Sequence, residues 1–183
     1  IGIGFDTRAN APTMQTHIGN AAMPTLPFPT PLGPCRLSWQ DDRITGFGLP
    51  SDGRPEHTVA AGTLPRWIQA VIGRVQRHLA GDPQDFADLP YAFDRVEPFA
   101  REVYRATLQV KPGRTCSYGD IARKLGRPPA VSRAIGVTLG ANPWPLLVPC
   151  HRVVASDGKM TGFSGPGGIR TKLRLLALEG AQL

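Results

Sequence analysis

A cysteine and a histidine lie side by side in the segment Pro149-Cys150-His151-Arg152-Val153, directly after an apolar run at residues 146–148. The thiolate is the reactive form of cysteine, but a free thiol has a pKa near ~8.5, so a nearby base or positive charge is needed at neutral pH. His151 is the adjacent candidate base, acting directly or through one water molecule. The alternative is inert packing, because most buried cysteines are unreactive and neighbours on an extended strand point to opposite sides.

A histidine that acts as a base needs a third group to orient its ring, and Glu179 is our candidate. It lies in the last turn of a predicted helix that ends at Gly180. A carboxylate there opposes the helix dipole and costs about 0.3–1 kcal/mol, so its position favours a specific task. The alternative is a solvated surface glutamate.

The second half of the chain contains the predicted elements that would position these residues. Apolar spacing predicts a helix over residues 99–110, a short helix capped by Ser117 that ends at Gly126, and a third helix over residues 130–140. Two short helices joined by a turn with glycine and proline are typical of a helix-turn-helix. Because the same pair is also an ordinary packing unit, the pattern leaves DNA binding and simple packing about equally favoured.

Charge is distributed unevenly along the 183 residues, whose formal net charge is +7. From residue 94 onward there are 14 Lys and Arg against 6 Asp and Glu, whereas residues 1–93 hold 7 against 8. A positive field confined to one half attracts polyanions, so nucleic acid is the expected partner and its binding should depend on salt. The alternative is a basic surface that serves solubility.

Composition limits the class of protein. A hydrophobic content of 41% suffices for a core. No apolar run approaches the ~20 residues of a membrane span, and the start lacks a secretory pattern, so we expect a cytoplasmic protein without membrane partners. Cys35, Cys116 and Cys150 show no paired spacing, so we expect reduced thiols and no metal site.

The chain divides into three predicted regions. Residues 1–34 form a mobile, proline-rich arm, whose first 13 residues we interpret as an addition ahead of a natural start at Met14. Residues 35–92 form a small α/β domain, with a hairpin at 35–48, a helix over 64–79 that Thr63 would cap, and a linker at 81–90. Residues 93–183 form the domain that carries Cys150.

Taken together, residues 94–183 resemble the O6-alkylguanine-DNA alkyltransferases. That family has a proline-cysteine-histidine-arginine run eight residues after an asparagine that opens an Asn-Pro turn, and Cys150 and Asn142 keep this spacing. The resemblance implies an α+β fold, with a small N-terminal α/β domain of antiparallel sheet plus helix and a mainly helical, winged-helix-like DNA-binding domain. It also implies a monomer that needs no cofactor and binds double-stranded DNA, with cooperative binding left open.

The implied reaction is DNA repair by direct, irreversible transfer of an alkyl group, such as methyl, from O6-alkylguanine to Cys150. Each molecule would act once, and the damaged base would be flipped out of the duplex. His151 would be the base acting through water, and Glu179 would orient it. Asn142 would brace the reactive turn, although capping an ordinary Asn-Pro turn involves similar contacts.

DNA contacts are also implied by the resemblance. Flipping a nucleotide costs a few kcal/mol unless something fills the gap. Arg133 would enter through the minor groove and replace the base, with small Ser132 and Ala134 beside it, whereas an isolated helical arginine is usually just solvated. The Tyr118 hydroxyl would approach the N3 edge of guanine and help it leave; inward packing is the alternative.

A loop at residues 162–165 matches the family segment that closes over the base. The Ser164 N–H would face O6, Phe163 would form a stacking wall, and the Val153 and Cys150 carbonyls would accept from the exocyclic amine. Pro145 would line the same pocket. Cys35 and Cys116 match no ligand of the metal site found in some relatives.

Two rival functions differ in class from alkyl transfer. The first is a non-enzymatic sensor that flips and holds the alkylated base to recruit other repair factors; relatives of that kind lack the reactive cysteine, which is present here as Cys150. The second is a Cys-His hydrolase, which needs a distant His or Asn and an oxyanion site that the sequence does not display.

Overall fold

A computed structural model of the protein describes residues 24–51, 64–157 and 162–181. The N-terminal part contains β1 (Thr25–Phe28), β2 (Cys35–Gln40), β3 (Arg43–Gly48) and α1 (Arg66–Leu79). The C-terminal part contains α2 (Pro98–Thr107), β4 (Cys116–Ser117), α3 (Tyr118–Lys124), α4 (Ser132–Gly140), β5 (Val153–Val154) and α5 (Ile169–Leu178), with short 3-10 helices at Phe93–Arg95, Pro129–Val131 and Cys150–Arg152. The predicted α+β fold class is confirmed.

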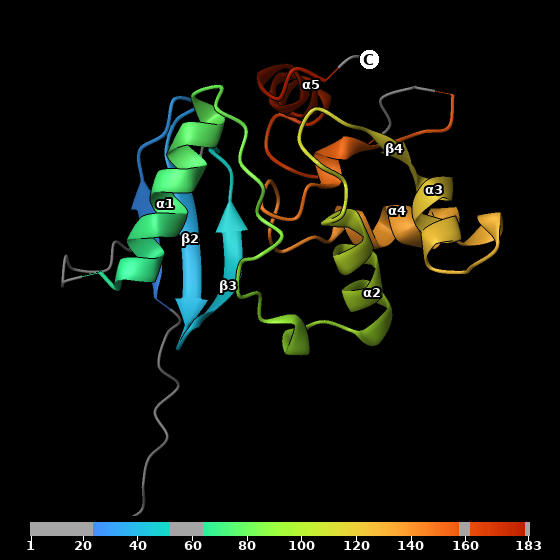
Figure 1. The fold of residues 1–183 in the computed structure, drawn as a ribbon, viewed down its shortest axis with the longest axis horizontal. Helices are drawn as coiled ribbons and strands as arrows, with labels where there is room; N and C mark the ends of the chain where they lie inside the picture. The colour runs from blue at the N-terminus through green and yellow to red at the C-terminus, as the bar shows by residue number, and fades with distance from the viewer. Residues whose placement is uncertain (1–23, 52–63, 158–161, 182–183) are drawn as a thin grey trace, which may run out of the picture.

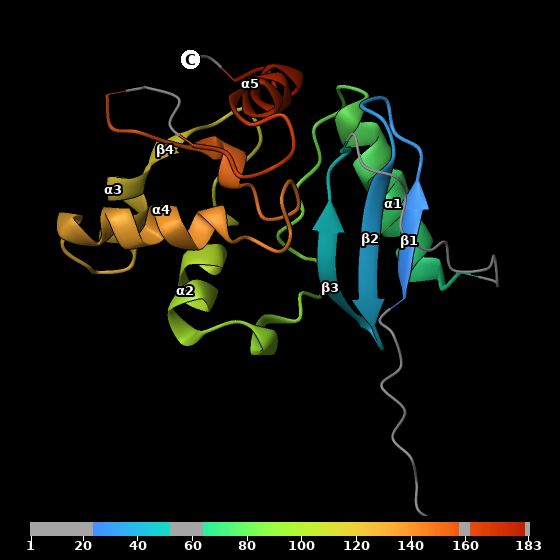
Figure 2. The ribbon, with the colours of Figure 1, turned by 180° about the vertical axis from the view of Figure 1, so that it is seen from behind.

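The N-terminal part is an antiparallel sheet in the order β1-β2-β3, with α1 across one face (Figures 1 and 2). The predicted hairpin is correct: β2 and β3 pair as Gln40↔Arg43, and Asp41 takes the left-handed conformation of the turn at φ 54°. The helix predicted over 64–79 begins two residues later, at Arg66, and the proposed cap Thr63 lies outside the described residues.

Strand β1 corrects the prediction that residues 1–34 form a mobile arm. It pairs with β2 from Thr25↔Ser38 to Phe28↔Cys35, and Phe28 is buried. An edge strand is hydrogen-bonded on one side only, so Pro27 can lie in it without leaving a ladder bond unmade. The prolines that indicated an arm are therefore compatible with a strand at this edge. Residues 1–23 lie outside the described part.

The two parts share one continuous hydrophobic core. Trp144 is its centre: the indole N–H donates to the Ile44 carbonyl at 3.0 Å, and the ring makes edge contacts with Tyr91, Phe93 and Tyr104. The segment predicted as a linker is packed as well, because Phe86 is only 2% exposed. The loop before Cys150 is therefore held between the edge of β3 and the helices.

The helical part is built on α2, α3 and α4. Ser117 caps α3 as predicted: its hydroxyl accepts from the Asp120 N–H at 3.0 Å, and the Asp120 carboxylate accepts from the Ser117 N–H at 2.7 Å. A turn through Pro129–Val131 leads into α4, so α3 and α4 form the predicted helix-turn-helix (Figure 1). In the three described ranges, every helix is too short or too polar to cross a bilayer.

Candidate active site

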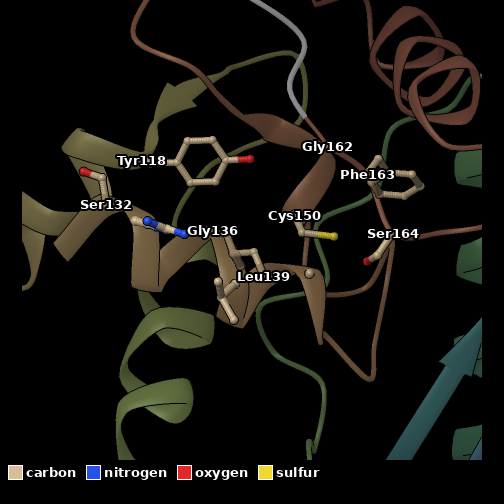
Figure 3. A pocket seen from close by; sticks show the side chains of 11 residues that line it. Tyr118, Ser132, Gly136, Leu139, Cys150, Gly162, Phe163 and Ser164 are labelled. Atoms are coloured by element: carbon tan, nitrogen blue, oxygen red, sulfur yellow. The ribbon is translucent and has the colours of Figure 1, made fainter. Parts of the chain in front are cut away.

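Cys150 lies in the wall of a cavity of about 680 Å³ between α3, α4 and the loop at 162–164. Tyr118, Ser132, Arg133, Phe163 and Ser164 line it as well. In Figure 3 the Tyr118 hydroxyl points toward the side where Cys150 lies, and the sulfur points toward the loop that carries Ser164. A second cavity of about 360 Å³ shares Cys150 and Ser164 and extends toward the N-terminal sheet. The cysteine is therefore buried, at 8% exposure, but faces open space.

The loop before Cys150 is braced by Asn142. Its amide N–H donates to the Val148 carbonyl at 2.9 Å, and its oxygen accepts from the Trp144 N–H at 3.0 Å. Leu146 adopts a left-handed φ of 77°, which costs a non-glycine residue about 1–3 kcal/mol and is tolerated because its side chain is fully buried. Cys150 itself begins a 3-10 turn rather than continuing a strand, so the strand geometry that separates neighbouring side chains does not apply.

The predicted partnership of His151 and Glu179 is present in the structure. His151 Nε2 lies 2.8 Å from Glu179 Oε1, and both side chains are fully buried. Since the carboxylate can only accept, Nε2 carries the ring proton and Nδ1 keeps its lone pair. Within the described ranges, Nδ1 has no hydrogen-bond partner. The imidazole is therefore in the tautomer that can take a proton at Nδ1.

Glu179 is surrounded by donors. Arg152 binds it with two N–H groups, Nε to Oε2 at 2.9 Å and Nη2 to Oε1 at 2.8 Å, and the Gly113 N–H approaches Oε2 at 3.4 Å. His78 Nε2 lies 3.1 Å from Oε1. Burial opposes ionisation of this carboxyl, but the hydrogen bonds from His151, His78 and Arg152 outweigh it and hold the pKa of Glu179 well below its usual range. The carboxylate is thus a permanent buried anion and not a solvated surface group.

Burial also sets the resting charges of the reactive pair. It raises the pKa of the Cys150 thiol, although a hydrogen bond with Asn142 and the charge of Lys172 act in the opposite direction. It lowers the pKa of His151, against the hydrogen bond and charge of Glu179. The resting site therefore holds a neutral thiol and a neutral imidazole. The thiolate therefore forms only when a proton leaves for a base, and His151 is the adjacent base.

The predicted DNA-contacting residues lie on the open side of the cavity. Arg133 is exposed on α4 and lines the cavity together with Ser132, whereas Ala134 is exposed but not part of the lining. Tyr118 is the first residue of α3 and its ring lies against Gly136, where an added Cβ would be 3.7 Å from the ring. Arg133 and Tyr118 thus reach the same space from two helices.

The pocket residues are only partly where the resemblance placed them. Ser164 lines both cavities, and the Phe163 ring packs against Gly165, where a Cβ would collide with it. Pro145 lines the second cavity, together with Asn142. Val153 is fully buried and lies outside both cavity linings, and its carbonyl accepts from Lys172 Nζ at 2.7 Å.

The Cys150 carbonyl is also engaged, because it accepts from the backbone N–H of Val153. In the described structure both carbonyls assigned to the exocyclic amine of guanine therefore already accept a hydrogen bond from the protein. Each carbonyl oxygen has a second lone pair, which can accept one further hydrogen bond.

Three polar residues of the site were missed by sequence reasoning: His78, Arg152 and Lys172. All are buried. His78 follows Val71 and Val75 at helical spacing, and Lys172 precedes Glu179 by two turns on the buried face of α5. A polar residue on an apolar helical face was the signal that could have identified His78 and Lys172.

The remaining cysteines, Cys35 and Cys116, line neither of the two cavities. Burial raises the pKa of Cys35 and of Cys116 to about 11 in each case. A search of residues 24–51, 64–157 and 162–181 finds no cluster of three His, Cys, Asp or Glu side chains that could hold a metal ion.

Several known proteins are similar to this chain in sequence. Residues 98–181 match the family model of the 6-O-methylguanine DNA methyltransferase, DNA binding domain. A methylated-DNA–protein-cysteine methyltransferase of Methanosarcina acetivorans is 38% identical over 84% of this chain and 96% of its own length. A DNA base-flipping protein of Thermus thermophilus is 40% identical over 84% of this chain and 98% of its own length.

Solved structures give the same picture. The crystal structure of Mycobacterium tuberculosis OGT in complex with DNA has a TM-score of 0.71 at 33% identity, covering 85% of this chain and 92% of that one. The M. tuberculosis O6-methylguanine methyltransferase has a TM-score of 0.67 at 29% identity, covering 87% of this chain and 93% of that one.

Proposed function

Because this chain belongs to the O6-methylguanine-DNA methyltransferase family, we propose that it repairs DNA by moving an alkyl group from guanine O6 to the sulfur of Cys150. The observation that carries this proposal is a cavity with a thiol in its wall and, at the next residue, a buried imidazole bonded to a carboxylate. Methyl is the simplest group, and the product on the protein is a thioether.

The transfer begins with the neutral pair. The Cys150 thiol loses its proton to His151 Nδ1, directly or through one water, and Glu179 stabilises the imidazolium that forms. The sulfur then attacks the alkyl carbon, the bond between that carbon and O6 breaks, and its electrons remain on guanine. Tyr118 donates its hydroxyl proton to the leaving base and is reprotonated by the His151 imidazolium through water, so the net change moves the thiol proton to guanine. Since no step restores the thiol, each molecule acts once.

Access to the lesion requires the base to leave the duplex, because the sulfur lies in a recessed cavity. Arg133 is exposed on α4 and lines the cavity, and it fills the space that the flipped base leaves in the duplex. Ser132 contacts the phosphate backbone of the DNA. The excess of Lys and Arg after residue 94 supplies the sequence-independent attraction to phosphate.

A second candidate function is base flipping without transfer, which the name of the T. thermophilus relative favours. Such a protein would bind the lesion and leave its alkyl group in place. Cys150 distinguishes the two candidates, since a sensor has no use for a thiol on the cavity wall.

Mass spectrometry after incubation with a duplex containing O6-methylguanine tests the proposal. We expect a permanent gain of one methyl group on the peptide that contains Cys150, in wild type and in the control Cys116→Ser, and none in Cys150→Ser. Tight binding of the lesion by wild type with no mass gain would establish the sensor instead. A transient adduct that hydrolyses would indicate a hydrolase.

A further inference from the structure

A histidine from the N-terminal part reaches the carboxylate that orients the candidate base. His78 lies in the last turn of α1, its side chain is fully buried, and its Nε2 is 3.1 Å from Glu179 Oε1. The other donors to this carboxylate, His151, Arg152 and the Gly113 N–H, all belong to the C-terminal part. Among these polar groups around Glu179, His78 is the one that comes from the N-terminal part.

The tautomer of His78 is set by its second ring nitrogen. Nδ1 accepts a hydrogen bond from the Gln84 backbone N–H at 3.0 Å, so it carries no proton. A neutral imidazole with a bare Nδ1 has its proton on Nε2, the atom that faces Glu179. The protein therefore fixes the roles of both ring nitrogens: Nδ1 accepts from the loop after α1, and the Nε2 proton faces the Glu179 carboxylate.

The contact with Glu179 is bent rather than linear. Nε2 is within hydrogen-bonding distance of Oε1, but its N–H is not well aligned, and Nε2 has no straighter acceptor in the described part of the chain. The ring is confined by Phe86, whose centroid lies 5.3 Å away. A buried N–H without an acceptor is costly, so the carboxylate is the group that makes this position tolerable for histidine.

Three nitrogens therefore lie close to Oε1 of Glu179: His151 Nε2 and Arg152 Nη2 donate to it at 2.8 Å each, and His78 Nε2 approaches to 3.1 Å in a bent geometry. Arg152 donates to both carboxylate oxygens, which by itself would hold the carboxylate in the plane of the guanidinium group. The His78 contact comes from the N-terminal part, so it links the position of Oε1 to the position of α1.

We propose that His78 is a positioning residue for alkyl transfer, which holds Glu179 Oε1 toward His151 and so ties α1 to the reactive turn. This inference rests on the proposed function, because it concerns the same base. It assigns the N-terminal part a role in the chemical step itself. The contact is made through Glu179, and His78 does not touch the sulfur or the cavity lining.

The test separates binding from chemistry with three variants. His78→Phe removes the donor and keeps an aromatic ring, and His78→Gln can restore an N–H toward Glu179. Arg66→Gln is the matched control, because Arg66 is an exposed residue at the start of the same helix. For each we would measure the affinity for a duplex with O6-methylguanine and the single-turnover transfer rate at saturating protein.

We expect His78→Phe to slow transfer about tenfold, the effect of losing one hydrogen bond to a charged group, while DNA affinity stays unchanged. His78→Gln should recover most of the rate, and Arg66→Gln should match wild type. A His78→Phe protein that folds and transfers at the wild-type rate overturns the role. Equal slowing by Phe and Gln also overturns it, because packing would then be the cause.

Nitrogen NMR of the wild-type imidazoles keeps the inference testable if His78→Phe does not fold. A protonated Nε2 with slow exchange and an unprotonated Nδ1 at His78 is the expected result, and a proton on Nδ1 overturns the proposal. Failure of the proposed function is distinguishable: there the wild-type protein would leave the lesion alkylated, whereas failure of this inference leaves wild-type transfer intact.

Discussion

Replacing Glu179 by Gln removes one charge from the buried cluster while keeping the size of the side chain. Arg152, at 2% exposure, would lose the counter-charge it binds with two hydrogen bonds of 2.9 and 2.8 Å. One carboxylate oxygen would also be replaced by an NH2 group, whose protons would face the N–H donors of Arg152 or His151. Breaking a buried ion pair from one side costs about 3–5 kcal/mol.

For a chain of this length each kcal/mol shifts Tm by about 2–4 °C, so Glu179→Gln should lower Tm by roughly 6–20 °C. Thermal unfolding at pH 7 followed by circular dichroism measures it. The matched control is Glu102→Gln, which breaks an exposed pair with Arg127 at 3.0 Å, where the two side chains are 48% and 46% exposed. Such a pair contributes about 0–1 kcal/mol.

The difference in Tm between wild type and Glu179→Gln should also depend on pH. A carboxyl whose folded pKa is depressed stabilises the protein above its unfolded pKa of about 4.3, and this contribution is lost as pH falls further. The Tm gap should therefore shrink under acid. If Glu179→Gln costs no more than Glu102→Gln at pH 7, the cluster is not the buried anion site described above.

Three further predictions follow from single contacts. Lys172→Met should raise the pKa of Cys150, because the lysine charge favours the thiolate. The pH dependence of Cys150 alkylation, followed by mass spectrometry in the Cys35→Ser, Cys116→Ser background, should then move to higher pH. An unchanged pH dependence would contradict this prediction. The free energy of unfolding should fall as pH drops below about 6.5, since burial lowers the folded pKa of His151 and the unfolded chain then binds more protons. Urea titrations should show a weaker fall for His151→Gln than for wild type. An equal fall in both proteins would contradict the lowered pKa of His151. Ser117→Ala should cost about 1 kcal/mol by removing the cap of α3, with an unchanged urea midpoint as the contrary result.

Much of the fold could be predicted because its signals are local. The apolar stripe of α1, the Asp41-Asp42 turn between β2 and β3, and the Ser117 cap of α3 each depend on a few neighbouring residues, and the structure confirms them. Strand β1 was missed because its prolines indicate a loop, and only its place at the sheet edge makes them acceptable. An edge position is a property of the assembled sheet.

The sequence by itself determined the reactive pair, since Cys150 and His151 are neighbours. Glu179 was chosen from its unfavourable place at a helix end together with the family resemblance. Only the tertiary structure decided which residues surround that carboxylate and which charges the pair carries at rest. His78 and Arg152 approach Glu179 from distant parts of the chain, and burial moves the Cys150 and His151 pKa values toward their neutral forms. The physical reason is that desolvation and charge pairing depend on what packs around a group, which local spacing does not encode.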